Sequence, residues 1–350
     1  MLDPVHELPD AARLAAYLRD RVEGFESTPV VRRLPGGQSN PTYRVDTPHR
    51  VYALRAKPAP AAQLLPSAHQ IEREYRVLSA LAGTDVPVPQ VQHLCTDEDV
   101  IGRAFFLMDF VDGRVFVDPR LADIAAAERA ALFDDMNRVM AALHAVPWQT
   151  LGLADYGKPG DYLARQIARW TRQYRASETD VIDSMDRLME WLPTALPHED
   201  VTTLVHGDFR LDNLVIDRHQ PRVVAVLDWE LSTLGSPLAD FAYHCCVWHF
   251  PAGLYRGLAG VPCPAGLPAE ADYRRAYEAR CGHEAGEHWD YYLIYNFFRM
   301  AAIVQGIRKR VLQGTAAGAD ADEFGRGARV LADLGWERAQ RWLARRGARP

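Results

Sequence analysis

The sequence predicts an α+β fold of two lobes, a five-stranded antiparallel sheet with a helix (residues 1–110) and a larger, mainly helical lobe (residues 111–350). Three observations support this prediction. Short β-branched and apolar runs separated by turns fill the first lobe, whereas apolar residues recur at helical spacing from about Ala122 onward. In the middle of the second lobe, residues 204–230 carry acidic and amide side chains at the ends of short apolar strands. The 350 residues are enough for two lobes of ordinary size.

Composition and charge argue against several classes of protein. Apolar residues make up 48% and charged residues 25%, as in soluble globular proteins. The net charge of −6 argues against a general nucleic-acid binder. The five cysteines include no C-x-x-C pair, which indicates reduced thiols and no zinc site. Acids and a proline stand where a signal peptide needs a basic start, and no apolar run approaches ~18 residues. We therefore expect a cytoplasmic protein without a membrane span; the sequence does not indicate its oligomeric state.

The first 110 residues are expected to alternate strands and turns. Leu14, Leu18 and Val22 recur at i, i+4 and i+8, which predicts a short helix over residues 10–23. The strands are expected where β-branched and apolar residues form short runs, and a second helix where apolar residues return to helical spacing. The expected strands are 30–34, 42–46, 51–56, 91–95 and 104–110, and the second helix is 71–81.

A glycine-rich turn follows the first strand and has the composition of a phosphate-binding loop. Its tip exposes backbone N–H groups and little side chain, so it can close over phosphates. The loop lacks a full G-x-G-x-x-G, and a plain hairpin turn is the alternative interpretation. Its position ahead of a strand cation supports phosphate binding. The candidate residues are Gly36, Gly37, Gln38, Ser39 and Asn40.

The third strand carries a cation near its end. Arg55 lies on this strand, and Lys57 follows two residues later on the same strand face. On the next helix, Glu74 shares a face with Leu78 and is the acid expected to turn toward the strand. Glu72 is interpreted as a solvated surface charge. A strand cation paired with a helix carboxylate would be held against the α/β-phosphates of a nucleotide.

The last strand of the first lobe is a candidate site for adenine. The chain leaves the lobe there, and adenine can form hydrogen bonds with the backbone while apolar side chains cover its faces. Asp109 and Val111 are the candidate residues of this segment.

The second lobe is expected to be mainly helical. Apolar residues at helical spacing, closed by prolines and glycines, define its helices. The expected helices are 128–146, 161–175, 182–192, a segment reaching about residue 248, 269–281, 287–313 and 322–346.

Residues 204–230 are the most informative stretch. The first strand leads into H-G-D, ending on Asp208, and Asn213 follows five residues later. A second apolar run ends on Asp228. A carboxylate can accept the proton of a hydroxyl, and hard oxygen ligands hold the Mg²⁺ of a nucleotide triphosphate. The pattern therefore indicates an ATP-dependent phosphotransferase; an ordinary hairpin with polar tips is the alternative.

These motifs resemble those of the aminoglycoside phosphotransferase family, relatives of the protein kinases that phosphorylate small molecules. More narrowly, they are similar to the branch found fused to acyl-CoA dehydrogenases in animals. The resemblance covers nearly the whole chain and implies a protein-kinase-like fold, with ATP and Mg²⁺ in a cleft between the lobes. It also implies a small-molecule hydroxyl as phosphate acceptor. The motifs that carry it are residues 36–43, 64–69, 206–213 and 227–230.

The resemblance also implies roles for single residues. Asp208 orients or deprotonates the acceptor hydroxyl, and Asn213 and Asp228 hold Mg²⁺ between the phosphates. Arg55 stands where kinases carry a lysine, and Glu74 where they carry the partner of that lysine. Two further positions are expected to be structural, Asp240 in the Ala-Asp-Phe sequence and His206, which braces the loop.

Arginine at the position of the kinase lysine is a departure from the family pattern. A planar guanidinium and a compact ammonium bind phosphate differently. Either Arg55 fills the role, or Lys57 reaches the phosphates from further along the strand; we favour Arg55.

The acceptor site is encoded less clearly. Three of the candidates follow i, i+4, i+7 on one helix face, for which a packed polar network is an equal alternative. The similar branch suggests a hydroxylated acyl thioester, whose anionic CoA tail would suit Arg299, Arg308, Lys309 and Arg310. Two rival functions are a nucleotide-binding regulatory pseudokinase without turnover and a true aminoglycoside-modifying kinase. The acceptor candidates are Glu230, Trp248, Tyr292, Asn296 and Arg299.

Overall fold

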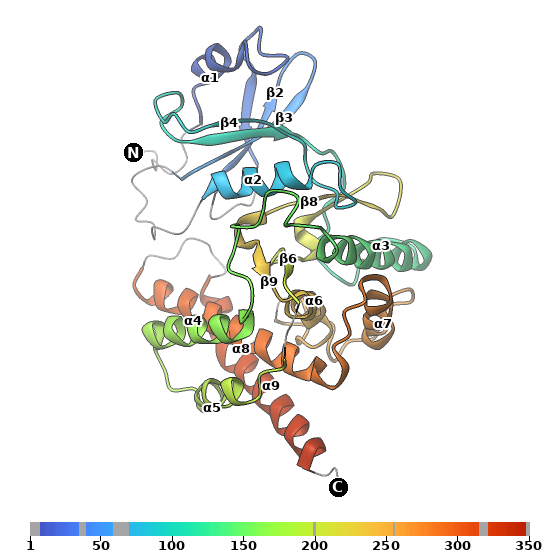
Figure 1. The fold of residues 1–350 in the computed structure, drawn as a ribbon. Coiled ribbons are helices and arrows are strands. Elements are labelled where there is room, and N and C mark those ends of the chain that lie inside the picture. The colour runs from blue at the N-terminus through green and yellow to red at the C-terminus, as the bar shows by residue number, and fades with distance from the viewer. Residues whose placement is uncertain are drawn as a thin grey trace. The chain divides into compact units, whose positions relative to one another are not determined.

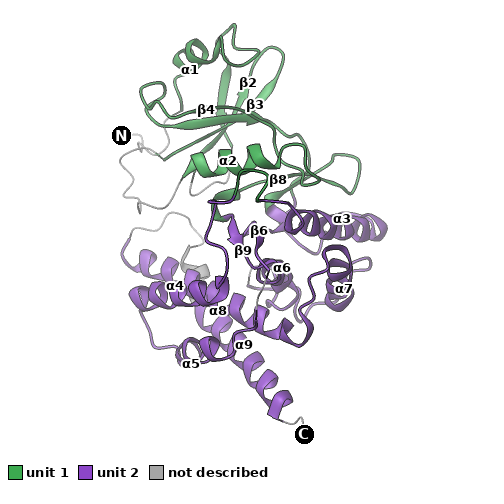
Figure 2. Cartoon of the chain, viewed as in Figure 1, with its two compact units in different colours: residues 1–115, 149–153, 213–231 green, residues 116–148, 154–212, 232–350 purple. Residues whose placement is uncertain are grey.

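The chain divides into two compact units (Figure 2). The first unit comprises residues 1–115, 149–153 and 213–231, and the second comprises 116–148, 154–212 and 232–350. Segments 149–153 and 213–231 thus belong with the first unit, although the sequence-based division at residue 110 assigns them to the helical lobe. The computed structural model describes residues 8–34, 40–58, 70–198, 201–254, 256–314 and 321–347, and side chains of the last segment from 327.

The first unit is built on a five-stranded sheet of the order β1-β2-β3-β5-β4, with every neighbouring pair antiparallel (Figure 1). This sheet and the helical second unit confirm the predicted fold class. The elements of the unit are α1 (Ala11–Leu18), β1 (Val30–Arg33), β2 (Thr42–Asp46), β3 (Val51–Ala56), α2 (Ile71–Leu81), β4 (Val91–Cys95), β5 (Phe105–Asp109), β7 (Leu214–Ile216), β8 (Val223–Val226) and the 3₁₀ turn η4 (Trp229–Leu231).

Strand β3 is buried on both faces because a helix covers each of them. Leu54 packs with Leu14 and Leu18 of α1 in one apolar cluster. Side chains alternate along a strand, so Arg55 points to the opposite face. There it contacts Glu74 of α2. The alternation places one charged residue of β3 within reach of a helix carboxylate.

Helix α1 is shorter than the predicted 10–23. Asp10 caps its start, with the carboxylate accepting hydrogen bonds from the backbone N–H groups of Ala12 and Arg13. After Leu18 the backbone N–H groups of Arg21 and Val22 both turn back to the Leu18 carbonyl oxygen, which ends the helix in a tight turn. Val22 remains buried against the sheet, so the apolar spacing continues although the helix does not.

Backbone hydrogen bonds tie the β7–β8 hairpin to the first unit. Arg114 and Ile216 exchange backbone hydrogen bonds of 2.7 and 2.8 Å, and the Val226 N–H donates to the Pro87 carbonyl at 2.8 Å. Gly113 allows this approach, because a Cβ at that position would lie 2.4 Å from the Ile216 oxygen. The hairpin therefore belongs structurally with the first unit, although it lies far along the sequence from the five-stranded sheet.

The second unit consists mainly of helices. The long apolar helix α8 packs against α9, α4 and α6 (Figure 1). A short antiparallel pair, β6–β9, was not predicted, since β9 has only three residues. The elements are α3 (Ala126–His144), α4 (Tyr162–Ser177), α5 (Asp183–Trp191), η2 (Leu192–Thr194), β6 (Thr203–Val205), η3 (Leu211–Asn213, crossing into the first unit), β9 (Thr233–Gly235), α6 (Pro237–Cys245), η5 (Cys246–Trp248), α7 (Glu270–Cys281), η6 (Gly286–His288), α8 (Trp289–Leu312) and α9 (Ala321–Gly347).

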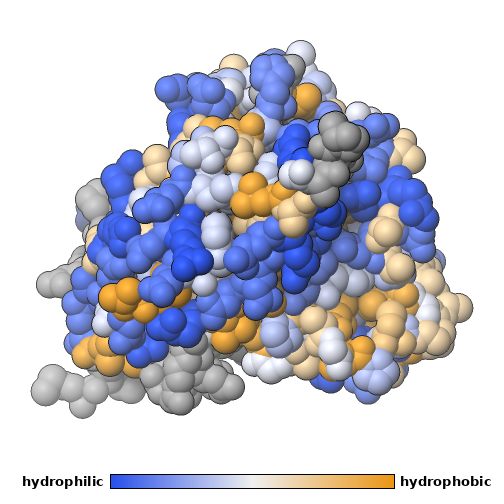
Figure 3. Space-filling model, turned by 90° about the horizontal axis from the view of Figure 1, so that it is seen from below, coloured by the Kyte–Doolittle hydropathy of each residue, from blue (hydrophilic) through white to orange (hydrophobic). Residues whose placement is uncertain are grey.

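Exposed apolar side chains are scattered over the surface. On the face shown in Figure 3, hydrophilic residues predominate and hydrophobic ones occur in separate groups. Single exposed apolar residues such as Val30, Val181 and Leu312 are normal for a folded protein. Within the described part of the chain, none of the helices has both the length and the apolar character needed to cross a bilayer.

Candidate active site

Arg55 is the centre of a buried ion-pair group in the first unit. Its Nε lies 2.8 Å from Glu74 Oε2, and its Nη2 lies 2.7 Å from Asp228 Oδ1 and 3.9 Å from Glu230 Oε2. Arg55 is 8% exposed and Glu74 only 2%. Burial opposes a charge at Arg55, but Glu74 and Asp228 outweigh it and raise the pKa of the guanidinium above its ordinary value. The expected contact between Arg55 and Glu74 is therefore present.

Asn40 completes the surroundings of Glu74. It is fully buried, and its Nδ2 donates a hydrogen bond of 2.8 Å to Glu74 Oε1. Both carboxylate oxygens of Glu74 thus have a partner, which holds this side chain in place beneath Arg55. The other residues of the glycine-rich loop, Gly36, Gly37, Gln38 and Ser39, lie outside the described residues.

Lys57 pairs with Glu72 rather than with the group around Arg55. The Lys57 Nζ lies 2.5 Å from Glu72 Oε1, and both side chains are partly exposed. Glu72 is a partly exposed surface charge, and the first turn of α2 brings it alongside Lys57, a contact that the sequence did not indicate. Of the two candidate cations, Arg55 is the one in contact with Asp228.

The β7–β8 hairpin brings Asn213 and Asp228 to the same end. Leu214 pairs with Val226, and the Leu227 N–H donates to the Asn213 carbonyl oxygen at 2.8 Å. Asp228 follows directly with a φ of 64°, a left-handed conformation that non-glycine residues rarely adopt and that is common at functional sites.

The donor atoms of Asn213 and Asp228 fit Mg²⁺. The described residues contain no group of three or more His, Cys, Asp or Glu side chains that could hold a metal ion. Mg²⁺ does not require one, because it is usually bound by one or two carboxylates together with phosphates and water. A carboxylate and an amide oxygen at one hairpin end are therefore suited to a nucleotide-bound Mg²⁺ and poorly suited to a free-standing metal centre.

Asp109 and Val111 lie at and just beyond the end of β5. The Asp109 carboxylate accepts hydrogen bonds from Arg50 (3.0 and 3.1 Å) and Gln92 (3.0 Å). Its backbone N–H donates to the Gln90 carbonyl oxygen at 2.8 Å. Val111 is partly exposed. The Asp109 side chain is thus held by its neighbours in the sheet, and adenine binding in this segment stays a prediction.

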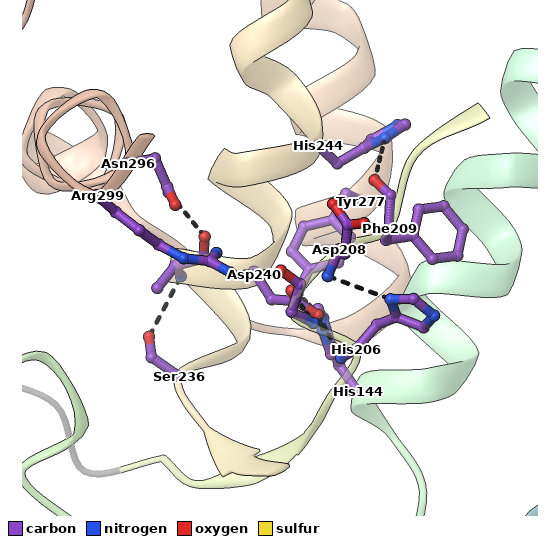
Figure 4. Close-up of polar contacts among 12 residues, drawn as sticks. His144, His206, Asp208, Phe209, Ser236, Asp240, His244, Tyr277, Asn296 and Arg299 are labelled. Carbon is purple, nitrogen blue, oxygen red and sulfur yellow. Dashed lines mark hydrogen bonds and ion pairs between the residues drawn. The ribbon is translucent and has the colours of Figure 1, made fainter. Parts of the chain in front are cut away.

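Asp208 lies in the second unit, shortly after β6. Its Oδ1 accepts a hydrogen bond from the Tyr243 hydroxyl and lies 3.1 Å from Arg210 Nε. Arg210 also reaches Asp212, with 3.2 Å between Nη2 and Oδ2. The Asp208 backbone N–H donates to His206 Nδ1 at 3.2 Å, so His206 braces the loop as expected (Figure 4). Tyr243 was not among the residues predicted from sequence.

Asp240 of α6 holds the backbone of the same loop. Its carboxylate accepts hydrogen bonds of 2.8 Å from the backbone N–H groups of His206 and Gly207, and His144 Nε2 lies 3.2 Å away (Figure 4). Burial opposes its charge, but His144, His206 and the backbone donor hold the pKa of the Asp240 carboxyl below its usual range. His144 Nε2 therefore donates, and its Nδ1 lies 2.6 Å from the Tyr277 hydroxyl. Asp240 thus has the structural role that the sequence suggested.

The candidates on α8 are mostly packing residues. Asn296 is fully buried, and its Nδ2 donates to the carbonyl oxygens of Ala239 and Tyr292, both at 2.9 Å. Arg299 donates to the Gly207 carbonyl oxygen at 2.7 Å, and its guanidinium lies 4.9 Å from the centre of the Tyr243 ring. The i, i+4, i+7 face is therefore a buried polar network, and Arg299 contacts the Asp208 loop.

The remaining acceptor candidates have contacts of their own. Trp248 Nε1 donates to the Pro268 carbonyl oxygen at 3.1 Å. Glu230 belongs to the first unit, beside Arg55. Near the end of α8, Arg308 pairs with Asp180 at 2.9 Å and Lys309 donates to the Ala176 carbonyl oxygen at 2.6 Å, while Arg310 is exposed.

A cavity of about 570 Å³ opens beside the Asp208 loop, within the second unit. Tyr243 and Arg210, which both contact the Asp208 carboxylate, line this cavity. Its charged lining residues among those described are Arg210, Arg256 and Asp212, and the last of these is paired with Arg210. Most of the remaining wall is apolar, including Phe133, Met136, Phe209, Val247, Phe250 and Met300.

His244 forms a neutral part of this cavity wall. Burial lowers its pKa from 6.5 to about 4. The neutral ring donates from Nδ1 to the Phe209 carbonyl oxygen (3.3 Å) and accepts at Nε2 from the Tyr273 hydroxyl (2.8 Å). The cavity therefore gains no positive charge from this histidine near neutral pH.

We expect His244 to make the protein less stable in acid. Between pH 6.5 and 4 the unfolded chain binds a proton at this histidine that the folded protein does not, so the free energy of unfolding falls as the pH is lowered through this window. Between pH 7 and pH 5 the loss from this residue is about 2 kcal/mol. Urea denaturation at both pH values should show that loss in the wild type and a correspondingly smaller one in His244→Gln. An equal decrease in the free energy of unfolding in the two proteins would contradict this role of His244.

Known proteins resemble this chain over most of its length. The model of the phosphotransferase enzyme family matches residues 30–286. The mouse protein acyl-CoA dehydrogenase family member 10 is 45% identical over 328 residues, which are 93% of this chain but only 30% of the mouse protein. The chain thus spans less than a third of the length of that relative.

Solved structures share the fold. A protein from Ralstonia eutropha assigned to the aminoglycoside phosphotransferases is 51% identical with a TM-score of 0.87, covering 96% of this chain and 99% of that one. The aminoglycoside phosphotransferase APH(4)-Ia, in a ternary complex with AMP-PNP and hygromycin B, has a TM-score of 0.61 at 17% identity, covering 94% and 99%. The latter likeness concerns the fold alone. From the match over residues 30–286 and the similarity to these proteins, we conclude that the chain belongs to the phosphotransferase enzyme family.

Proposed function

We propose that this protein transfers the γ-phosphoryl group of ATP to a hydroxyl group of a small molecule. The observation that carries the proposal is the ion-pair group in which Arg55 contacts both Glu74 and Asp228. It joins a buried strand cation, its helix partner and a hairpin-end carboxylate, the three charged parts that a kinase-type nucleotide site uses.

On the nucleotide side, Arg55 takes the place of a phosphate-binding cation. Its guanidinium keeps its charge when buried and lies next to Asp228, so a phosphate bound by Arg55 would lie next to a metal ligand. Asn213 and Asp228 would hold Mg²⁺, which when bound neutralises charge on the phosphates. The loop that contains Gly36, Gly37, Gln38, Ser39 and Asn40 would cover the phosphates, and the segment around Asp109 and Val111 would receive adenine.

On the acceptor side, Asp208 would orient the hydroxyl and accept its proton. A carboxylate held by its own hydrogen bonds is preorganised for this task and needs no rearrangement when the acceptor binds. Tyr243 supplies a hydrogen bond at Oδ1, and Arg210 forms an ion pair with the same oxygen.

The cavity beside Asp208 supports an acceptor that is partly apolar and carries a negative charge. Its wall is mostly apolar, Arg210 and Arg256 supply positive charge, and His244 remains neutral. A polycationic aminoglycoside needs acidic groups, and Asp212 is already paired with Arg210. A hydroxylated acyl thioester fits this chemistry better, and the names of the acyl-CoA dehydrogenase relatives support it.

A coupled assay of ADP release tests the proposed function. The panel contains a medium-chain hydroxyacyl-CoA, the free hydroxy acid, an aminoglycoside, an amino alcohol and a sugar, each with Mg-ATP. We expect turnover above the acceptor-free background with the hydroxyacyl-CoA, and little with the aminoglycoside. Arg256→Glu should raise the KM for the anionic acceptor by about 10-fold, because a like charge replaces an opposite one in the cavity wall.

Arg308→Glu is the matched control. Arg308 is on α8 and pairs with Asp180 outside this cavity, so its charge reversal should leave the acceptor KM within twofold. If Arg308→Glu raised the acceptor KM more than Arg256→Glu, the acceptor would bind near the end of α8 instead of in this cavity. Nucleotide binding without ADP release on any acceptor would favour the regulatory pseudokinase, and release with the aminoglycoside alone would favour a drug-modifying kinase.

A further inference from the structure

We propose that Tyr243 is a positioning residue that holds the Asp208 carboxylate in place for the acceptor hydroxyl, an inference that rests on the proposed role of Asp208. The contact is direct, because the Tyr243 hydroxyl donates a hydrogen bond to Asp208 Oδ1. Tyr243 itself is 7% exposed and lines the cavity beside the loop. The same side chain therefore touches both the candidate base and the space in which an acceptor would bind.

Helix α6 contacts both the backbone and a side chain of the Asp208 loop. Asp240 binds the backbone N–H groups of His206 and Gly207, and Tyr243, three residues further along the helix, binds the carboxylate of Asp208. Residues three apart lie on one helix face, so a single rigid element sets both the backbone and the side chain of the loop. Asp240 binds only the backbone of the loop, so without Tyr243 no residue of α6 described here would restrict rotation of the Asp208 side chain.

The phenol ring of Tyr243 also contacts Arg299. The guanidinium lies 4.9 Å from the ring centre and donates to the Gly207 carbonyl oxygen at 2.7 Å. Burial and the charge of Asp208 raise the pKa of the Tyr243 hydroxyl well above its ordinary value, so it stays protonated and continues to donate at alkaline pH.

Other polar groups also face Asp208. Arg210 lies 3.1 Å from the same carboxylate oxygen, His206 accepts the Asp208 backbone N–H, and Arg299 acts on it by charge. Arg210 is more exposed than Tyr243 and shares its guanidinium with Asp212. Among these groups Tyr243 combines burial with a direct bond to the carboxylate, and this makes it the positioning group.

Tyr243→Phe removes the donor and keeps the ring that Arg299 contacts. We expect kcat to fall by about 10- to 100-fold, as for the loss of a hydrogen bond to a charged group, while the KM for ATP stays within twofold. Calorimetric titration with ADP gives the fraction of folded, nucleotide-binding protein for normalisation.

Tyr174→Phe is the control for removing a buried hydroxyl. Tyr174 on α4 is fully buried, and the described residues offer its hydroxyl no hydrogen-bond partner. Its kcat should match that of the wild type. A Tyr243→Phe variant with wild-type kcat, or one whose loss of kcat equals its loss of nucleotide-binding protein, would overturn the proposal.

A spectroscopic measurement separates failure of this inference from failure of the proposed function. In protein labelled with ¹³C at tyrosine Cζ, the resonance absent from Tyr243→Phe belongs to Tyr243. Asp208→Asn should shift that resonance, because a neutral amide is a weaker acceptor than a carboxylate. No shift would overturn the contact whether or not the protein turns over ATP, whereas a shift in a protein without turnover would contradict only the proposed function.

Discussion

Asp208→Asn is expected to lower kcat by about 10²- to 10⁴-fold, the range for removal of a general base. Asparagine keeps the shape of the side chain and an oxygen that can accept the Tyr243 hydrogen bond, but it cannot take the proton of the acceptor. Nucleotide affinity should persist, because the groups proposed to bind ATP belong to the first unit and Asp208 to the second. Coupled ADP release gives kcat, and calorimetry gives the Kd for ADP.

Asp217→Asn is the matched control for this substitution. Asp217 follows β7, and its carboxylate caps the backbone N–H groups of His219 and Gln220 in an exposed turn. The same change of charge there should leave kcat within twofold. If Asp208→Asn retained the wild-type kcat and bound ADP normally, Asp208 would not be the base of the reaction.

Arg55→Ala is expected to be the most destabilising substitution in the nucleotide site. It leaves the Glu74 carboxylate, only 2% exposed, without its cation. Breaking a buried ion pair on one side costs about 3–5 kcal/mol of unfolding free energy. The KM for ATP should also rise, since the proposed phosphate contact is lost. Urea denaturation and steady-state kinetics measure the two effects, and Arg55→Lys should retain more of both than alanine does.

Two further variants identify the cause of that loss. Adding Glu74→Gln to Arg55→Ala removes the stranded charge and should recover part of the lost stability, since the amide can still accept from Asn40. Lys57→Ala removes a partly exposed pair and should cost less than about 1 kcal/mol. If Lys57→Ala raised the KM for ATP more than Arg55→Lys, the result would indicate that Lys57, and not Arg55, binds the ATP phosphates.

The sequence predicted the secondary structure of the first unit closely, because each element has a clear local signal. Strands 42–46, 51–56 and 91–95 and the helix 71–81 agree with the structure at both ends. The errors occur where a tertiary contact decides. Val22 is buried beyond the end of α1, and in the second unit the three residues of β9 form a strand through their pairing with β6.

The candidate site was predictable where spacing along the chain determines proximity in space. Arg55 and Glu74 follow from alternation in β3 and from the face of α2. The exception is the hairpin that brings Asn213 and Asp228 to one end, because strand β7 was not among the strands expected from the sequence.

Tyr243 could not be found in this way. It lies 35 residues after Asp208 on a helix whose apolar pattern marks every side as buried, and only the packing of α6 against the loop brings the two together. Similarly, the spacing of Asn296 and Arg299 indicated a shared face but gave no sign of whether a ligand or another helix covers it. The sequence did contain one indirect signal for Tyr243. It lies three residues after Asp240, and residues with this spacing share one face of a helix.

The most direct test of the account is to follow the label of [γ-³²P]ATP in a single turnover with the acceptor that gives the highest rate in the panel. If the protein transfers phosphate to a hydroxyl, the wild type should form one labelled, alkali-stable acceptor phosphate for each ADP, and Asp208→Asn should form almost none while it binds ADP normally. Label released only as inorganic phosphate, or equal transfer by both proteins, would contradict the account.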